Sequence, residues 1–336
     1  MSQEILKVAI NGFGRIGRSF FRLSLTDPHI QIVAINDPAD TKILAHLLKY
    51  DSIHGVINQN ISTDDDCIFC NDQQVLVTHK KNINKINWHS VQPDFVLESS
   101  GQFKSYEQLK NHIENGAKRC ILSVPPRDDD IKMVVLGVND HILSPDDQII
   151  SNASCTTNNA APMLDVVHKK IGVKQAYIST VHSYTTDQNL HDSPHRDLRR
   201  ARAANQSIIP TTTGAAKALT KIFPDFSNAI GGCGIRVPVS NGSLTDMTIY
   251  TKEKTNLKEI NQIFKDASQK YEHQILKYSY EPIVSIDIKN SPYSCVFDSE
   301  MTSVIDGNLL KLIGWYDNER GYSNRLLDLM KKISAF

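Results

Sequence analysis

The chain has 336 residues, of which 40% are hydrophobic and 22% charged, a composition typical of globular proteins and a length that favours two domains. Its 37 basic and 37 acidic side chains cancel, so net charge indicates neither nucleic-acid nor membrane binding. No apolar run approaches the ~20 residues of a membrane-spanning helix, and residues 1–7 lack the apolar segment of a secretory signal peptide. We therefore expect a cytoplasmic protein with no obligatory nucleic-acid partner and no membrane partner.

Apolar patterning in the first half predicts strands that alternate with helices. Strands are expected at residues 6–10, 31–36, 94–98, 120–124 and 133–138, and helices at residues 12–25 and 106–115. The first strand, the first helix and the second strand form a βαβ unit of about 30 residues. This alternation predicts an α/β fold with a Rossmann-type, doubly wound parallel sheet.

The pattern changes near residue 150. Ser154 is expected to cap a helix that begins at Cys155, and Pro162 is expected to kink or break that helix near Ala161. Further strands are expected at residues 176–181, 243–251, 283–288 and 309–315, with helices at residues 256–269 and 326–333. The second half therefore predicts an α+β domain in which helices cover one face of a mixed or antiparallel sheet.

The first predicted helix opens with a glycine fingerprint. Gly12, Gly14 and Gly17 fit G-x-G-x-x-G between a strand and a helix, and Asp37 follows twenty residues later. These glycines suit a tight turn, a close approach to pyrophosphate and close helix–strand packing. Asp37 would accept hydrogen bonds from ribose hydroxyls and repel a 2′-phosphate, which favours NAD over NADP. The alternative is that the glycines only shape a turn and Asp37 only caps it.

The clearest reactive group is Cys155, which stands at a predicted helix start and is followed in sequence by His182. A helix N-terminus and an imidazole can both lower the pKa of a thiol, so we expect an activated nucleophile. The alternative is a cysteine that merely fills space, but polar residues flank it at 154 and 156–158. A thiol beside a dinucleotide site suggests capture of an aldehyde on sulfur, followed by oxidation through hydride loss.

Two further groups of residues could bind an anion, although each also has a purely structural interpretation. Residues 209–216 offer hydroxyls and a glycine before a helix, which suits an anion, and Arg236 lies among apolar neighbours. Arg236 could instead form a structural ion pair, and the basic run at residues 196–202 is typical of a solvated or interface segment.

The six cysteines suggest no disulfide framework, and the C-x-x-C pair of Cys67 and Cys70 has no second pair to complete a zinc site. We predict unreactive thiols there and no metal.

Several sequence blocks carry a resemblance to a known family. They are NGFGRIGR (11–18), YDSIHG (50–55), SNASCTTN (151–158), DLRRARA (197–203), IPTTTGAAK (209–217), RVP (236–238), WYDNE (315–319) and GYSNR (321–325). With them the chain resembles the phosphorylating glyceraldehyde-3-phosphate dehydrogenases over essentially its full length. The resemblance implies NAD as cofactor, and a phosphorylated aldehyde and inorganic phosphate as substrates. It also implies a homotetramer in which residues 184–206 reach a neighbouring subunit's cofactor.

The resemblance also implies roles for individual residues. Cys155 would be the nucleophile and His182 the base that also steadies the oxyanion. The substrate and phosphate sites would comprise Thr185 and Arg236, with Asp187 positioning the arginine, and Ser154, Thr156, Thr213 and Gly214 for the attacking phosphate. The expected cofactor-binding residues are Gly12, Gly14, Arg15, Ile16, Gly17, Asp37, Lys81, Ser100, Gly101, Ser123, Asn318 and Tyr322. Residues 1–154 and 318–336 would form the NAD-binding domain, and residues 155–317 the catalytic domain.

The chain departs from the family pattern at positions that carry no catalytic group. These positions are Asn159, Thr186, Ser193, Ser240, Gly242 and Arg320. Asn159 stands where a second cysteine is common, and Ser193 weakens a strict preference for NAD. Two alternative functions remain open. One is an erythrose-4-phosphate dehydrogenase, which releases a free acid, and the other is a non-catalytic paralogue that binds NAD or RNA.

Overall fold

The computed structural model describes residues 5–226 and 228–336. Residues 1–4, part of the segment in which we expected no signal peptide, lie outside the described residues. The chain divides into two compact units, the first comprising residues 1–134, 141–153 and 323–336, and the second residues 135–140 and 154–322. The domains expected from sequence differ from these units by assigning residues 135–140, 154 and 318–322 to the first of them. No helix in the described ranges is both long and apolar enough to cross a membrane.

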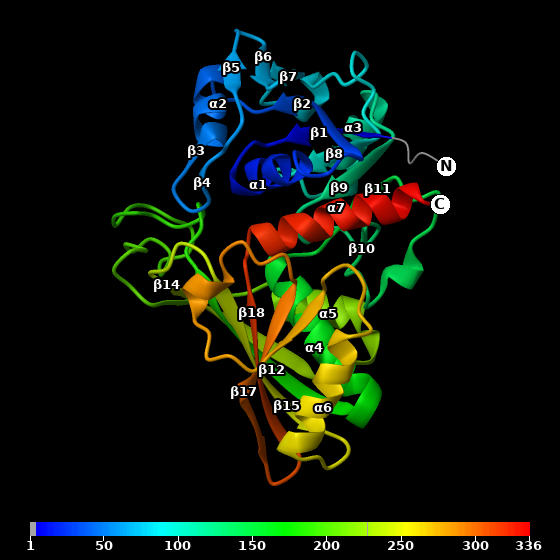
Figure 1. Cartoon of the computed structure of the whole chain (residues 1–336), viewed down its shortest axis with the longest axis vertical. Coiled ribbons are helices and arrows are strands. Elements are labelled where there is room, and N and C mark those ends of the chain that lie inside the picture. The colour runs from blue at the N-terminus through cyan, green and yellow to red at the C-terminus, as the bar shows by residue number, and fades with distance from the viewer. Residues whose placement is uncertain (1–4, 227) are drawn as a thin grey trace. The chain divides into compact units, whose positions relative to one another are not determined.

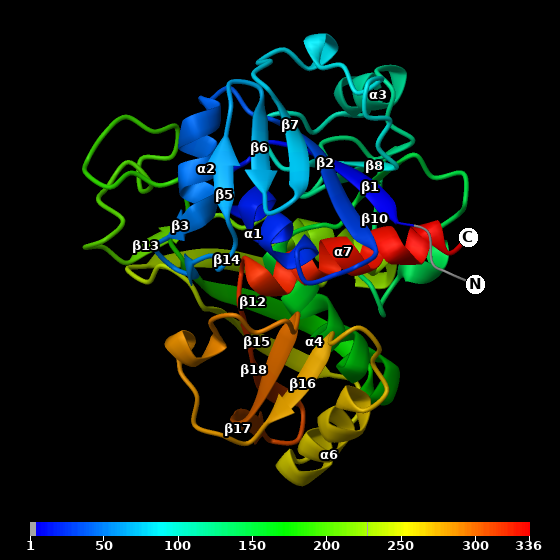
Figure 2. The ribbon, with the colours of Figure 1, turned by 45° about the horizontal axis from the view of Figure 1, so that its top comes forward.

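The first unit contains a nine-stranded sheet in the order β10-β11-β9-β8-β1-β2-β7-β6-β5 among the described residues (Figures 1 and 2). Its strands are β1 (Leu6–Asn11), β2 (Ile30–Asn36), β5 (Ile61–Thr63), β6 (Cys67–Cys70), β7 (Gln73–Thr78), β8 (Phe95–Glu98), β9 (Arg119–Leu122), β10 (Lys132–Met133) and β11 (Ile149–Ser151). The strands from β10 to β7 pair in parallel, as the alternating pattern predicts. Strands β6 and β5 extend this sheet in antiparallel pairing.

Helices and a small hairpin complete this unit. The helices are α1 (Arg15–Ser24), α2 (Thr41–Lys49) and α3 (Tyr106–Glu114), with a 3-10 turn at Ile83–Lys85. The hairpin pairs β3 (Tyr50–Asp51) with β4 (Gly55–Val56). The 3-10 turn Asp140–Ile142 and helix α7 (Arg320–Ser334) each begin in residues of the second unit and continue in the first. Trp88 packs with Ala9, Ala34 and Val96 in one buried cluster on the sheet. The parallel order, with helices between strands, confirms the Rossmann-type α/β prediction.

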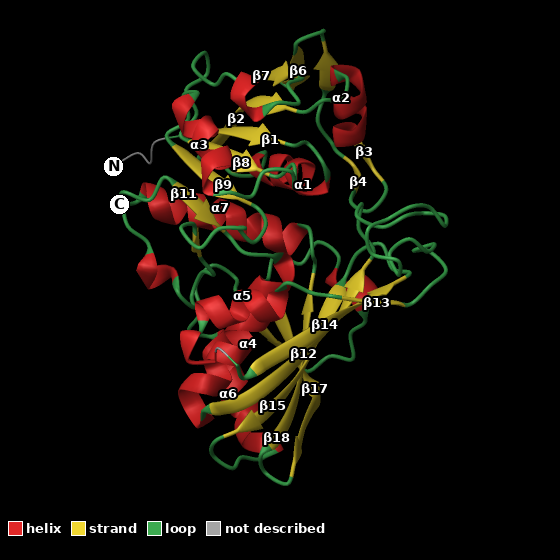
Figure 3. Cartoon of the chain, turned by 180° about the vertical axis from the view of Figure 1, so that it is seen from behind, coloured by secondary structure: helices red, strands yellow, loops and turns green. Residues whose placement is uncertain are grey.

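The second unit contains a mixed seven-stranded sheet in the order β13-β14-β12-β15-β18-β17-β16 among the residues that the structure describes. Its strands are β12 (Val173–Ser183), β13 (Ile209–Thr211), β14 (Ile230–Val237), β15 (Ser243–Thr251), β16 (Leu276–Ser279), β17 (Cys295–Ile305) and β18 (Leu309–Tyr316). Its helices are α4 (Cys155–Ile171), α5 (Ala215–Ile222) and α6 (Leu257–Ser268), with 3-10 turns at Pro224–Phe226 and Ser285–Ile288. Figure 3 shows these three helices on one face of the sheet, as we expected.

Three local predictions were wrong. The strand expected at 133–138 ends at Met133. Residues 283–288 form no strand, because Asp287 accepts from the backbone N–H of Val284 and closes a local 3-10 turn. Helix α4 continues through Pro162 without a break, because buried packing against the sheet outweighs the backbone hydrogen bond that proline removes.

The C-terminal helix is also longer than its apolar pattern predicts. It begins at Arg320 rather than at Leu326. The carboxylate of Asp317 accepts from the backbone N–H groups of Glu319 and Arg320, each at 2.8 Å. These bonds satisfy donors that the first helical turn leaves without an intrahelical partner, so they stabilise the early start.

Candidate functional site

In the first unit, the residues expected to bind a dinucleotide follow the carboxyl ends of parallel strands. Gly12 and Gly14 follow β1, Asp37 follows β2, Ser100 and Gly101 follow β8, Ser123 follows β9, and Lys81 comes three residues after β7. Adjacent parallel strands present their carboxyl ends at one edge of a sheet, which is the edge where open α/β sheets bind ligands. The fold of this unit therefore gathers residues that lie up to about a hundred positions apart in the sequence.

The three glycines of the fingerprint differ in what surrounds them. Gly12 has a φ of +92°, and a Cβ there would lie 2.4 Å from the backbone of Ser100. A Cβ on Gly17 would lie 2.4 Å from the carbonyl oxygen of Gly12, whereas a Cβ on Gly14 would meet nothing within 4 Å. Gly14 precedes α1, whose first turn carries no acidic side chain. Open space before a helix N-terminus suits a pyrophosphate, so these residues fit a dinucleotide.

Asp37 is half-buried beside this loop. Its Oδ2 accepts from the backbone N–H of Phe13 at 2.8 Å, and its Oδ1 accepts from that of Ala39 at 3.0 Å. The carboxylate is therefore held in place and remains able to accept further hydrogen bonds. Arg15 forms an ion pair with Asp51 at 2.6 Å, so its guanidinium charge is already balanced within the unit.

In the second unit, Cys155 is the first residue of α4. Ser154 caps this helix, since its hydroxyl accepts from the backbone N–H of Thr157 at 3.1 Å. The Sγ atom of Cys155 lies 3.5 Å from Nε2 of His182 on β12, within the reach of a thiol–imidazole hydrogen bond. The expected helix start and the expected cysteine–histidine pairing are both present.

His182 lies opposite Arg236 in the parallel pairing of β12 with β14. Its Nδ1 is 2.6 Å from Nη1 of Arg236 and 2.7 Å from the carbonyl oxygen of Ser183. Burial and the charge of Arg236 lower the pKa of His182 to about 3. The imidazole is therefore neutral at physiological pH and has one unprotonated ring nitrogen.

The electrostatics of the thiol differ from our expectation. Desolvation raises the pKa of Cys155 above its ordinary value, although Arg236 and hydrogen bonds from Thr156 act in the opposite direction. We had expected the helix N-terminus and the imidazole to lower it. A neutral imidazole contributes no charge, so it does not stabilise the thiolate as an imidazolium would.

The hydroxyl of Thr156 faces the protein interior. It lies 2.9 Å from the hydroxyl of Tyr316, which also lies 3.0 Å from the Thr180 hydroxyl. Burial raises the pKa of Tyr316 far above its usual range, so this phenol stays protonated. Thr156, expected to contact the attacking phosphate, uses its side chain to pack the helix start against the sheet.

One predicted substrate-site residue and the segment before Thr213 contact a second arginine, Arg200. Asp187, which we expected to position Arg236, forms its ion pair with Arg200 instead. Arg200 also donates to the Thr211 hydroxyl at 3.0 Å and to the Thr212 carbonyl at 3.3 Å. Its guanidinium thus supports the segment that leads to Thr213 and Gly214. Gly214 caps α5, and a Cβ there would meet nothing within 4 Å.

Sequence reasoning missed Arg200, because one arginine in a basic run looks like a solvated side chain. Its pairing with Asp187, thirteen residues earlier, is a tertiary contact that leaves no local signal in the sequence. Thr185 lies two residues before Asp187, and its backbone N–H donates to the Gln188 side chain at 3.1 Å.

Asn318 and Tyr322, expected near a nicotinamide, are both buried in the second unit. The Asn318 Oδ1 accepts from the Ser183 hydroxyl at 2.9 Å and from the Ser243 hydroxyl at 3.2 Å. These bonds orient the amide so that its nitrogen points away from them and is available to donate.

No cluster of three or more histidine, cysteine or acidic side chains among the described residues is arranged to hold a metal ion. Cys67 and Cys70 are free and buried on β6. Burial raises the pKa of Cys70, and a raised thiol pKa disfavours the reactive thiolate.

Two family models match the chain. One is described as "Glyceraldehyde 3-phosphate dehydrogenase, NAD binding domain" and covers residues 6–106. The other is described as "Glyceraldehyde 3-phosphate dehydrogenase, C-terminal domain" and covers residues 154–318. Together the two matches include the glycine fingerprint, Cys155, His182 and Arg236.

Curated relatives match over nearly the full length. The glyceraldehyde-3-phosphate dehydrogenase of Geobacillus stearothermophilus is 44% identical over 331 residues, which cover 98% of each chain. Glyceraldehyde-3-phosphate dehydrogenase 2 of Bacillus subtilis is 43% identical over 98% of this chain and 97% of its own. The Borreliella burgdorferi enzyme of the same name is 45% identical over 98% of this chain and 99% of its own.

Proposed function

This chain belongs to the glyceraldehyde-3-phosphate dehydrogenase family, and on that premise we propose that it oxidises glyceraldehyde 3-phosphate to 1,3-bisphosphoglycerate with inorganic phosphate and NAD. The observation that carries the proposal is the 3.5 Å approach of Cys155 Sγ to His182 Nε2 at the start of α4. A thiol with an adjacent neutral base is the arrangement that nucleophilic catalysis requires. The reaction is a step of glycolysis, and we expect it to take place in the cytoplasm.

The first half of the reaction forms a covalent bond to sulfur. The Cys155 sulfur attacks the aldehyde carbon while its proton passes to Nε2 of His182. The new C–S bond converts the carbonyl oxygen into an oxyanion, and the protonated imidazole can donate to that oxygen. The carbon then loses a hydride, with its electron pair, and becomes a thioester. NAD, when bound, supplies the acceptor for that hydride.

The second half releases the product. An oxygen of inorganic phosphate attacks the thioester carbon, the C–S bond breaks with its electrons on sulfur, and the acyl phosphate leaves. Splitting the oxidation and the phosphorylation into two steps lowers the barrier of each. We propose that Arg236 and Thr185 bind the phosphate of the aldehyde, with Asp187 acting through Arg200. Thr213, Gly214, Ser154 and the backbone of Thr156 would receive the attacking phosphate.

The cofactor would be held chiefly by the first unit. The glycine loop and the start of α1, including Arg15 and Ile16, would receive the pyrophosphate, and Asp37 the adenosine ribose. We assign the remaining contacts to Lys81, Ser100, Gly101, Ser123, Asn318 and Tyr322. We further propose that the protein assembles as a homotetramer, which light scattering coupled to size-exclusion chromatography would test.

One assay tests the function. NADH formation is measured with glyceraldehyde 3-phosphate and with erythrose 4-phosphate, each with and without inorganic phosphate. We expect turnover only with the triose phosphate and phosphate together. Cys155→Ser should abolish turnover, whereas Cys233→Ser, which changes another half-buried thiol, should retain it. Equal turnover with erythrose 4-phosphate in phosphate-free buffer, yielding a free acid, would refute the proposal.

A further inference from the structure

Four polar residues end adjacent parallel strands and form a hydrogen-bonded row across the first unit's sheet. They are Glu98 on β8, Asn11 on β1, Asn36 on β2 and Thr78 on β7, which are paired in register in that order. Asn11 Nδ2 donates to Glu98 Oε2 at 2.5 Å, and Asn36 Nδ2 donates to Asn11 Oδ1 at 2.8 Å. The Thr78 hydroxyl donates to Asn36 Oδ1 at 2.8 Å. Each of these donors faces in the direction of Glu98.

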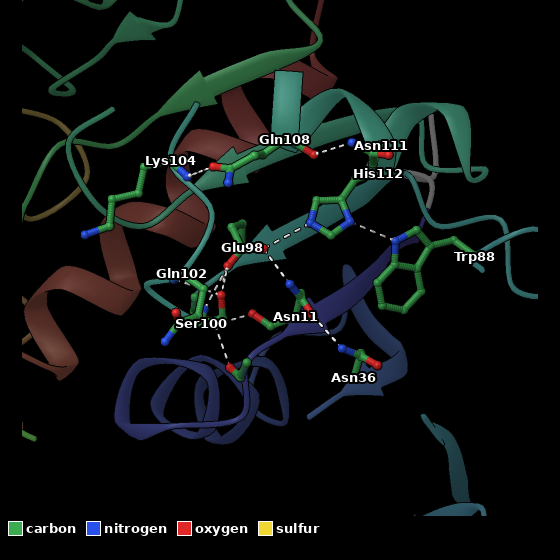
Figure 4. Close-up of polar contacts among 12 residues, drawn as sticks. Asn11, Asn36, Trp88, Glu98, Ser100, Gln102, Lys104, Gln108, Asn111 and His112 are labelled. Atoms are coloured by element: carbon green, nitrogen blue, oxygen red, sulfur yellow. Dashed lines mark hydrogen bonds and ion pairs between the residues drawn. The ribbon is translucent and has the colours of Figure 1, made fainter. Parts of the chain in front are cut away.

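The row continues beyond Glu98 to His112 and Trp88, as Figure 4 shows. His112 Nε2 lies 3.0 Å from Glu98 Oε2, and its Nδ1 lies 3.1 Å from the indole Nε1 of Trp88. An indole N–H is only a donor, so Nδ1 of His112 accepts and the neutral ring carries its proton on Nε2. That proton is donated to Glu98. All three residues are at most 1% exposed, so water does not replace these bonds.

Glu98 transmits this arrangement to a turn beside the glycine-rich loop. Its Oε1 accepts from the backbone N–H of Ser100 at 2.9 Å and from the Ser100 hydroxyl at 2.5 Å. The Ser100 backbone lies directly against Gly12, where no Cβ could fit. The buried carboxylate thus accepts four hydrogen bonds, which compensate for its loss of hydration. Without the His112 donor, Oε2 of Glu98 would lose one of its two hydrogen bonds, so the carboxylate would be held less firmly in the orientation that Ser100 contacts.

We propose that Trp88, His112 and Glu98 are positioning residues for the dinucleotide site, which hold the Ser100 turn and the glycine-rich loop in the conformation that binds NAD. This inference rests on the proposed function of that site. The indole fixes the imidazole tautomer, the imidazole orients the carboxylate, and the carboxylate orients Ser100. None of the three needs to touch the cofactor.

Substitution at residue 112 separates this role from simple packing. A glutamine there can accept from Trp88 and donate to Glu98, as the neutral imidazole does, whereas a leucine of similar bulk can do neither. Trp88→Phe removes the donor that fixes the tautomer and part of the buried indole, but it keeps an aromatic ring. Tyr271→Phe is the matched control, because it removes a comparable hydrogen bond, 3.1 Å to Asp165, in the second unit.

The experiment measures the dissociation constant of NAD by titration calorimetry, and the KM for NAD and for the aldehyde, in the full-length protein. We expect His112→Leu to weaken NAD binding and to raise the KM for NAD by about tenfold, the loss of one buried hydrogen bond to a charged group. The KM for the aldehyde should stay unchanged. The dissociation constant of NAD should stay within about threefold of the wild-type value in His112→Gln and should rise about threefold in Trp88→Phe. Tyr271→Phe should bind NAD with wild-type affinity.

The outcomes are distinct. Wild-type NAD affinity in His112→Leu, or equal losses in His112→Leu and His112→Gln, would overturn the inference and leave the proposed function intact. If His112→Leu does not fold, Trp88→Phe decides, and wild-type affinity in that variant overturns the inference. A wild-type protein that binds no NAD refutes the proposed function instead, before any variant is compared.

Discussion

Arg236 places its Nη1 2.6 Å from Nδ1 of His182 on the neighbouring strand. A guanidinium only donates hydrogen bonds, so this contact makes Nδ1 an acceptor and leaves the ring proton on Nε2, toward Cys155. The Ser183 carbonyl, 2.7 Å from the same Nδ1, favours the opposite tautomer, in which Nε2 is free to accept the thiol proton. The base function of His182 therefore depends on where the Arg236 side chain lies. An anion that draws the Arg236 side chain away would break its hydrogen bond to Nδ1. Nδ1 could then carry the ring proton and donate it to the Ser183 carbonyl.

Alkylation of Cys155 should be slow at neutral pH and should accelerate well into the alkaline range. Desolvation raises the pKa of this thiol above its ordinary value, and Arg236 partly opposes that effect. The thiolate fraction, and with it the rate of iodoacetamide labelling, should rise by about tenfold per pH unit up to that raised pKa. Arg236→Leu should slow labelling further at each pH. A labelling rate that reaches a plateau near pH 6 would contradict this prediction.

The stability of the protein should fall in acid partly because of His182. Its pKa is about 3 in the folded protein and about 6.5 when unfolded. The unfolded chain therefore takes up a proton first, and the contribution of His182 to stability, fully present above pH 6.5, is lost as the pH falls toward 3. Between pH 7 and pH 5 the loss is about 2 kcal/mol.

His182→Gln, which cannot titrate, provides the comparison. The urea midpoints of wild type and variant, measured at pH 7 and pH 5, should converge as the pH falls. Parallel decreases in the two midpoints would show that His182 is not held neutral in the folded state.

Two alanine substitutions in the glycine fingerprint should have opposite consequences. Gly12→Ala places a Cβ 2.4 Å from the Ser100 backbone at a φ of +92°, so it should destabilise the fold by about 2–4 kcal/mol. Gly14→Ala meets nothing within 4 Å and adopts an ordinary φ of −74°. It should leave the melting temperature nearly unchanged but weaken NAD binding, because its methyl group enters the space left for the pyrophosphate. Thermal unfolding and NAD titration of both variants check this, and a normal NAD affinity in Gly14→Ala would contradict it.

The parts of the fold that follow from local patterns were predictable. The β1–α1–β2 unit, the cap at Ser154 and the strand Ser243–Thr251 each depend on neighbours in the sequence. Strand β14 was missed because its sequence, IGGCGIRV, contains three glycines and little alternation. Its position is determined instead by pairing with β12, about 50 residues away, and such long-range register has no local signature.

The candidate site divides in the same way. Cys155, His182 and Arg236 could be named from their motifs and neighbours. The direction of the Cys155 pKa shift could not, because it results from burial created by distant segments. The pairing of Asp187 with Arg200 and the row from Thr78 to Trp88 depend likewise on tertiary contacts between separate segments.

Asp37 should set the preference for NAD over NADP. Asp37→Ala removes a carboxylate that could accept hydrogen bonds from ribose hydroxyls, so it should weaken NAD binding by about 1–3 kcal/mol. Part of the loss would arise from the loop, because Phe13 would lose its 2.8 Å hydrogen bond. Loss of the negative charge should also reduce the ratio of kcat/KM for NAD to kcat/KM for NADP. Comparison of kcat/KM for both cofactors tests this, and equal use of the two by the wild type would point to Ser193 instead.

Two substitutions should distinguish the site for inorganic phosphate from the site for the phosphate group of the aldehyde. Thr213 precedes the cap of α5, and its hydroxyl accepts from the backbone N–H of Ala215 at 3.3 Å, so it borders a helix N-terminus that suits an anion. Thr213→Ala should raise the KM for inorganic phosphate several-fold more than the KM for the aldehyde. Arg236→Leu should do the reverse, because its guanidinium is proposed to bind the phosphate that the aldehyde already carries. It should also lower kcat, since the tautomer of the adjacent His182 would no longer respond to substrate. Steady-state kinetics with each substrate varied in turn would measure these effects, and an equal rise in both KM values for either variant would show that one shared anion site serves both phosphates.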